Sequence, residues 1–267
     1  MMLLSSISFA QIEEYVKYQN QINRAELNLV RGDKFEALNI YYNTLLNYNG
    51  NFCKDIYNGL LLSYELSKKD TFFTLLDLLL SKSLSNSYLE EHFESYHDHL
   101  EWKAFLVKNK GTSSVNIDLK NKIDSLEIRD QFFRKKEGSY DKYAKEIREI
   151  DSENMDYIFS LVSSNNFPGE NKIGVSDFKG NQGYDIVFHH WAQSSSVEED
   201  KEKITPIIVN LVLEGKITPN KASQWLEMQN IDYSTGVFDI MRFKIGEEMT
   251  DYYIPKVTIQ HACVLRI

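Results

Sequence analysis

Two helices meet at the sequence Leu29-Val30-Arg31-Gly32-Asp33-Lys34-Phe35-Glu36-Ala37, and the pattern around it predicts how the N-terminal half folds. Gly32 suits the left-handed residue that ends one helix, and Asp33 suits the cap that begins the next. Beyond the turn, apolar residues recur in steps of three and four along one helical face, namely Phe35, Leu38, Tyr41 or Tyr42, and Leu45. The stretch therefore predicts two antiparallel helices joined by a tight turn.

The same helical spacing of apolar residues extends over most of the N-terminal half. It predicts five helices, at about 12–30, 34–48, 52–67, 71–83 and 87–107. No catalytic cluster stands out on these helices, so this half is expected to act as a scaffold or a binding surface.

Around its first turn the chain resembles a tetratricopeptide repeat. Small residues stand at Ala25 and Ala37, an aromatic ring stands at Tyr41, and Gly59 follows Ala25 by the 34-residue period of that repeat. The resemblance covers roughly residues 15–107, and it implies a protein or peptide partner bound through the helical repeats. Another array of helical hairpins is the alternative.

Composition narrows the function classes. The chain has 267 residues, and 30 Lys and Arg against 39 Asp and Glu give it a net charge of −9. Binding to nucleic acid needs a basic face that neutralises phosphates, so nucleic-acid partners are not expected. No stretch approaches the roughly 20 apolar residues that span a bilayer, so no membrane span is expected.

A polar segment divides the chain. The segment 108–114 contains no apolar residue, which is typical of a linker; its sequence is Lys108-Asn109-Lys110-Gly111-Thr112-Ser113-Ser114. The expected organisation is a tetratricopeptide-like helical domain at 11–107, a linker at 108–117 and a helix-rich α+β domain at 118–267. The predicted fold class is therefore mainly α, with helical hairpins followed by an α+β domain that has a few short C-terminal strands.

The elements of the second domain follow from caps and periodicity. Helices are expected at about 118–136, 140–149, 152–164, 204–214 and 219–229, and short strands near 237–243, 252–254 and 257–259. Asp151 or Ser152 would cap the helix at 152–164, and Thr218-Pro219 would begin the last one. The run 184–191 is apolar, β-branched and aromatic, and it fits a buried strand or a helix equally.

Polar residues in this second domain carry another resemblance. The elements are Arg129-Asp130-Gln131-Phe132-Phe133-Arg134, then Asp151 with Asn154, then Phe167-Pro168-Gly169, then His189-His190. Their order resembles an uncharacterised bacterial domain-of-unknown-function family, catalogue number sixty-six twenty-four, over roughly 118–230. This family has no established activity, so the resemblance implies a shared fold and a shared polar pocket.

The candidate catalytic residues are His190, Asp130, Arg134 and Gln131, and the candidate binding residues are Asp151, Asn154 and His189. An imidazole beside a carboxylate, an arginine and amides suits general base catalysis with oxyanion stabilisation. We expect His190 rather than His189 to face the helix of Asp130 and Arg134. The alternative is structural, because Asp130 and Arg134 can form an ordinary i, i+4 pair. The sequence thus predicts a protein-interaction or scaffold module, with a hydrolase-like enzyme as the alternative.

The spacing of histidines and cysteines bears on cofactors, and the N-terminal residues bear on the compartment. His92, His97 and His99 are not spaced to share a helical face, and Cys53 and Cys263 lie far apart, so no metal or cofactor is expected. Residues 1–10 are apolar and end in the small-x-small sequence Ser8-Phe9-Ala10 before Gln11, which resembles the end of a signal peptide. Export is therefore expected, and a cytoplasmic location is the alternative.

Overall fold

The computed structural model describes residues 9–93, 100–108, 115–178, 180–194, 198–227, 238–245 and 248–255. The protein is mainly helical, as expected, and in the described part no helix is long and apolar enough to cross a membrane. Residues 1–8, His97, His99, most of the polar linker, the third expected strand and Cys263 lie outside the described residues. Export therefore stays a prediction.

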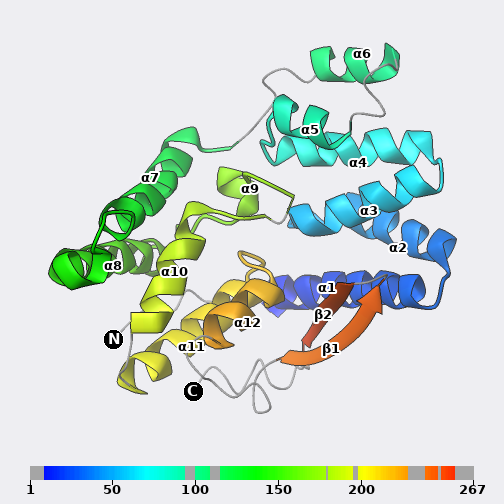
Figure 1. Ribbon diagram of the computed structural model, residues 1–267. Coiled ribbons are helices and arrows are strands. Elements are labelled where there is room, and N and C mark those ends of the chain that lie inside the picture. The colour runs from blue at the N-terminus through cyan, green and yellow to red at the C-terminus, as the bar shows by residue number, and fades with distance from the viewer. Residues whose placement is uncertain are drawn as a thin grey trace.

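The N-terminal half contains α1 (Phe9–Val30), α2 (Lys34–Asn47), α3 (Cys53–Glu65), α4 (Lys69–Ser81), α5 (Asn86–His92) and α6 (Leu100–Lys108). The first four helices pack in sequence order, each against the next (Figure 1). Gly32 adopts φ +84° at the first turn, and the Asp33 side chain accepts a hydrogen bond from the backbone N–H of Glu36 at 3.2 Å. The predicted turn chemistry is confirmed.

Small residues allow the hairpin helices to approach closely. Ala25 and Ala37 are fully buried, and a Cβ on Gly59 would lie only 3.2 Å from Leu75 Cδ1.

The expected single helix at 87–107 was wrong, because α5 ends before Phe93, whose backbone is no longer helical at φ −124° and ψ 41°.

The second half contains α7 (Ile117–Arg134), α8 (Ser139–Ser163), α9 (Glu170–Ile173), α10 (Gly183–Ser194), α11 (Glu198–Leu213) and α12 (Pro219–Glu227). In Figure 1, α7 and α8 project to one side, α9 and α10 lie between them and the hairpins, and α11 and α12 lie below α10. The run 184–191 is helical, because it forms most of α10. The expected break near residue 150 was wrong, since α8 is continuous there and departs from helical angles only at Tyr143.

Close backbone packing positions α10. A Cβ on Gly183 would lie 2.5 Å from the carbonyl oxygen of Ile123, so the start of α10 rests directly on the backbone of α7. On its other side, Phe188 stacks on Trp225 of α12 with ring centroids 4.0 Å apart. Helix α10 is thus held between α7 and α12.

One hydrophobic core runs through both halves of the described chain, from Tyr15 in α1 to Trp225 in α12. Polar contacts follow the same path: Glu170 accepts a hydrogen bond from the backbone N–H of Cys53 at 2.6 Å, and Val175 donates to the carbonyl oxygen of Lys82 at 2.9 Å. The division into two domains stays a prediction, but the expected halves share their packing.

The C-terminal described residues form an antiparallel pair, β1 (Phe238–Ile245) and β2 (Glu248–Pro255). Phe238 pairs with Pro255 at one end and Ile245 with Glu248 at the other. Strand β2 lies beside α1 and α12 (Figure 1).

Candidate functional site

Two helices, α7 and α10, bring the predicted catalytic side chains together. Asp130 lies on α7, is only 1% exposed, and places its Oδ1 and Oδ2 at 2.9 Å and 2.8 Å from Nδ1 of His190 on α10. Arg134, one helical turn beyond Asp130, has Nη1 at 3.1 Å from the Oδ1 of Asp130. The juxtaposition of His190 with Asp130 and Arg134 matches the expectation from the sequence.

Asp151 joins this group from α8. Its two carboxylate oxygens each accept a hydrogen bond from Nη2 of Arg134 at 2.8 Å. Burial raises the pKa of Asp151, and the neighbouring guanidinium acts in the opposite direction. Burial opposes the charge of Arg134, but its hydrogen bonds to Asp151 and Tyr140 and the charges of Asp130 and Asp151 raise its pKa. Asp151 therefore pairs with an arginine and does not cap a helix.

We call Asp130, Arg134, Asp151 and His190 the buried clamp, because they tie α7, α8 and α10 together. A buried ion pair needs full hydrogen bonding to offset the cost of removing its charges from water. The clamp meets this need well: Gln131 Nε2 donates to Oδ2 of Asp130 at 2.8 Å, and Arg134 Nη1 donates to the carbonyl oxygen of Asp130 at 2.9 Å.

Two predicted binding residues lie outside the clamp. Asn154 is fully buried, and its Nδ2 donates to the carbonyl oxygen of Leu126 at 3.3 Å, so it links α8 to α7. The ring of His189 is edge-on to that of His190, with centroids 5.2 Å apart. His189 does not bind Asp130; it lines the groove described below. Burial and the nearby His190 lower the pKa of His189, which favours the neutral form of its ring.

The clamp contains part of a catalytic arrangement. A carboxylate that binds Nδ1 of a histidine fixes the ring and leaves Nε2 for proton transfer. Nε2 of His190 makes no hydrogen bond to a described residue, and no described serine, threonine or cysteine bonds to this ring. The geometry thus supplies an oriented base and, in the described residues, no partnered nucleophile.

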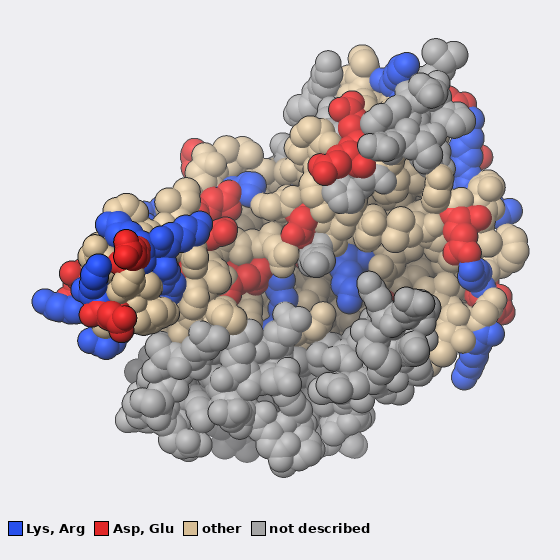
Figure 2. All heavy atoms as spheres, in the orientation of Figure 1, with Lys and Arg blue, Asp and Glu red and all other residues tan. Residues whose placement is uncertain are grey.

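A large groove opens beside the clamp, with a volume of about 820 Å³. Its walls come from α7, the segment before α10, α10 itself and α12; the lining residues are Asp124, Glu127, Ile128, Ser176, Asp177, Asn181, Gln182, Gly183, Asp185, Ile186, His189, Lys221 and Trp225. We call it the acidic groove, because four carboxylates face one lysine. Figure 2 shows acidic side chains grouped on the surface between α7 and the helical hairpins.

Two oxygen atoms on the groove wall lack donors. Asp185 Oδ2 accepts hydrogen bonds from Lys221 Nζ and from the backbone N–H of Gln182, both at 2.8 Å, whereas Oδ1 is buried without a partner among the described residues. Oε1 of Gln182 is also buried and unpartnered there, while its Nε2 donates to Gly174. Burial raises the pKa of Asp185, and Lys221 acts against this. Unsatisfied buried acceptors are rare, and here both favour a ligand that carries N–H groups.

Apart from His189, the residues that line the groove were not predicted from the sequence. The groove forms because α10 is a helix that packs on α12, which brings together Asp185, Gln182, Lys221 and Trp225. The sequence did not decide whether the run at α10 is a helix or a strand. In the described residues, no group of three or more His, Cys, Asp or Glu side chains is placed to hold a metal ion.

The chain matches no protein-family model, and no curated protein or solved structure is significantly similar to it. The two resemblances seen in the sequence therefore remain interpretations, and function has to be inferred from the geometry of the site.

Proposed function

We propose that the protein is an interaction module that binds a basic segment of a partner protein in the acidic groove. The observation that carries this proposal is the pair of donorless oxygens, Asp185 Oδ1 and Gln182 Oε1, on a wall that is rich in carboxylates. Ammonium and guanidinium groups supply the N–H donors and the positive charge that such a wall lacks.

The shape and the apolar residues of the groove support a peptide rather than a single ion. Its volume of about 820 Å³ is near the upper end of ordinary ligand pockets. Ile128, Ile186 and Trp225 line it among the carboxylates, and Ile128 is 72% exposed. A segment that alternates apolar and basic side chains matches this mixed lining.

The buried clamp has a supporting role in this proposal. Asp130 and Arg134 lie on the same helix as Asp124 and Glu127 of the groove, and His190 is the neighbour of His189. By holding α7 against α10, the clamp keeps two walls of the groove at a fixed separation.

A labelled peptide of alternating leucine and arginine tests the proposal by fluorescence anisotropy. We expect it to bind, a leucine–glutamate peptide of equal length not to bind, and added salt to weaken binding. Glu127→Lys should reduce affinity about tenfold, since it reverses a charge on the wall. Asp156→Lys is the matched control, because Asp156 is exposed on α8 outside the groove, and its affinity should match that of the unaltered protein. Equal binding of both peptides, or equal loss in both variants, would contradict the proposal.

The second candidate is the hydrolase-like enzyme, favoured by the contact between His190 Nδ1 and Asp130. Hydrolysis of p-nitrophenyl acetate measures it directly. Under this alternative, His190→Ala abolishes turnover and leaves the unfolding midpoint nearly unchanged. If the contact is structural, the same variant loses about 1–3 kcal/mol of stability, because the carboxylate of Asp130 stays buried without its partner.

Two further parts of the proposal concern architecture. The hairpins α1–α4 would act as a tetratricopeptide-like scaffold, supported by the buried small residues Ala25 and Ala37. Exposed apolar side chains at Phe35, Leu61 and Tyr64 support a second partner surface on this scaffold. The C-terminal half would be an α+β domain, with β1 and β2 in support.

A further inference from the structure

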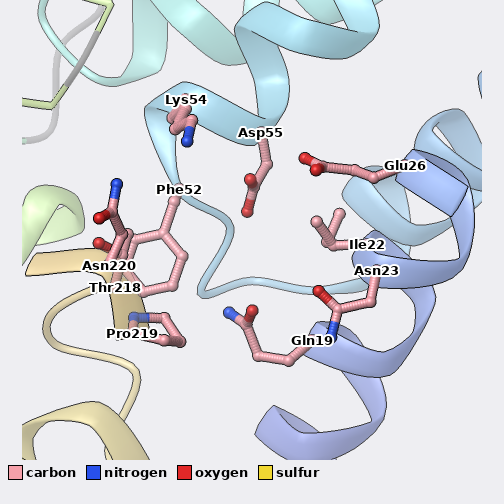
Figure 3. A pocket seen from close by; sticks show the side chains of 10 residues that line it. All are labelled: Gln19, Ile22, Asn23, Glu26, Phe52, Lys54, Asp55, Thr218, Pro219 and Asn220. Atoms are coloured by element: carbon pink, nitrogen blue, oxygen red, sulfur yellow. The ribbon is translucent and has the colours of Figure 1, made fainter. Parts of the chain in front are cut away.

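A small cavity lies between α1, the start of α3 and the start of α12, and it shares no lining residue with the acidic groove. Its lining comprises Gln19, Ile22, Asn23, Glu26, Phe52, Lys54, Asp55, Thr218, Pro219 and Asn220 (Figure 3). We call it the α1–α3 pocket. Its volume of about 50 Å³ has room for a few water-sized groups, which suits a ligand of two or three heavy atoms.

Two buried carboxylates face this pocket. Figure 3 shows the carboxylate of Glu26 on α1 and that of Asp55 on α3 directed into the same space, with the side-chain amide of Gln19 below them. Glu26 is 6% exposed and Asp55 is 9% exposed. Tyr18 donates to Oδ2 of Asp55 at 2.5 Å, so one oxygen of that carboxylate is engaged.

Glu26 is only half satisfied. Its Oε1 accepts hydrogen bonds from Tyr41 at 3.0 Å and from Asn58 at 3.4 Å. Its Oε2 is buried and has no hydrogen-bond partner among the described residues, and the same holds for Nδ2 of Asn23 one turn before it. An unpaired buried carboxylate oxygen is costly, because it has lost its water without gaining a donor.

The charged and titratable groups that face Glu26 are Asp55 and Lys54 on α3 and Tyr41 on α2. Lys54 is the single cation among them, and it forms no ion pair with a described residue. The site therefore has two carboxylates and an amide oxygen against one lysine. It lacks positive charge and N–H donors.

We propose that the α1–α3 pocket binds the primary ammonium group of a small alkylamine, with Glu26 and Asp55 as its acceptors. An ammonium group carries three donors and fits the available volume, whereas a quaternary ammonium carries none. This site is separate from the acidic groove, so its test stands independently of the proposed function.

Titration of ¹⁵N-labelled protein with methylammonium chloride, at constant total chloride, tests the site by NMR. We expect shifts at the side-chain amides of Asn23 and Gln19, with a Kd on the order of 10 mM, near the ceiling for so few atoms. Tetramethylammonium should cause no such shifts. Burial raises the pKa of Glu26 to about 7, so methylammonium should bind about tenfold more tightly at pH 8 than at pH 6.

Two variants localise the effect. Glu26→Gln keeps the shape and removes the charge, so binding and its pH dependence should be lost. Glu13→Gln is the matched control, because Glu13 is exposed on the same helix, and it should bind as the unaltered protein does. Should Glu26→Gln fail to fold, the comparison of the two amines at two pH values still decides the matter.

A further arm identifies the source of the ammonium group. Tighter binding of Nα-acetyl-lysine methylamide than of methylammonium would assign the pocket to a protein side chain, and weaker binding would assign it to a free amine; both support an ammonium site. Absence of shifts, equal shifts with tetramethylammonium, or unchanged binding in Glu26→Gln would overturn the proposal.

Discussion

Single buried carboxylates govern how the stability of this protein responds to pH. Glu26 shows the effect most clearly, because burial, with the nearby Asp55 charge adding to it, raises its pKa from 4.5 to about 7. The folded state therefore holds this proton where the unfolded chain has released it. Stability from this group is fully present below about pH 4.5 and is lost as the pH rises to about 7.

Glu26→Gln removes that dependence, because glutamine cannot ionise. We expect the variant to gain stability over the unaltered protein between pH 4.5 and pH 8, by about 3 kcal/mol in all. Urea unfolding at three pH values in an amine-free buffer measures the difference. Glu13→Gln, at an exposed position of the same helix, controls for the change from glutamate to glutamine. If the stability difference between Glu26→Gln and the unaltered protein does not vary with pH, the raised pKa of Glu26 is refuted.

At the level of elements, the placement of α10 decides whether a groove exists. Its helix begins at a glycine that rests on α7, its middle stacks on α12, and its end reaches the clamp through His190. A small change at the first contact should therefore affect the groove wall several residues away.

Gly183→Ala places a methyl group 2.5 Å from the carbonyl oxygen of Ile123, and neither backbone can move without shifting a helix. We expect a loss of about 1–3 kcal/mol in urea unfolding and weaker binding of the leucine–arginine peptide. Ser152→Ala, at an exposed position of α8, should change stability by less than about 0.5 kcal/mol. An alanine variant as stable as the parent would show that α10 is not held this tightly.

At the level of the whole molecule, the two expected domains are bound together by buried polar contacts. The backbone N–H of Cys53 donates to Glu170, the ammonium of Lys82 donates to Asn171, and a Cβ on Gly174 would lie 2.5 Å from the carbonyl oxygen of Lys82. Burial lowers the pKa of Lys82, and Glu170 acts against this from the other half of the chain. Without that half, the hairpins lose these hydrogen bonds and part of their core.

The isolated fragment 1–107 should therefore melt without a sharp transition and bind a hydrophobic dye, since its core residues become exposed. Adding the fragment 108–267 should restore a cooperative transition in circular dichroism. A fragment that melts as sharply, and at the same temperature, as the full chain would establish an independent N-terminal domain.

Local features of this protein could be predicted from its amino-acid sequence. Apolar spacing and the Gly32–Asp33 turn were enough to predict α1 and α2, and Thr218-Pro219 to predict the start of α12. The i, i+4 spacing of Asp130 and Arg134 was enough to predict that they pair. These features depend on residues within one or two helical turns, so the local chain carries the information.

Other features depend on how the helices pack against one another. The periodicity of 184–191 fits a strand and a helix equally. In the structure the run is helical, with Gly183 packed on α7 and Phe188 stacked on Trp225. The sequence suggested that Asp151 caps a helix. In the structure it accepts a hydrogen bond from the guanidinium of Arg134, 17 residues before it. Such pairings depend on which faces meet once the chain is packed, and a local pattern does not encode that choice.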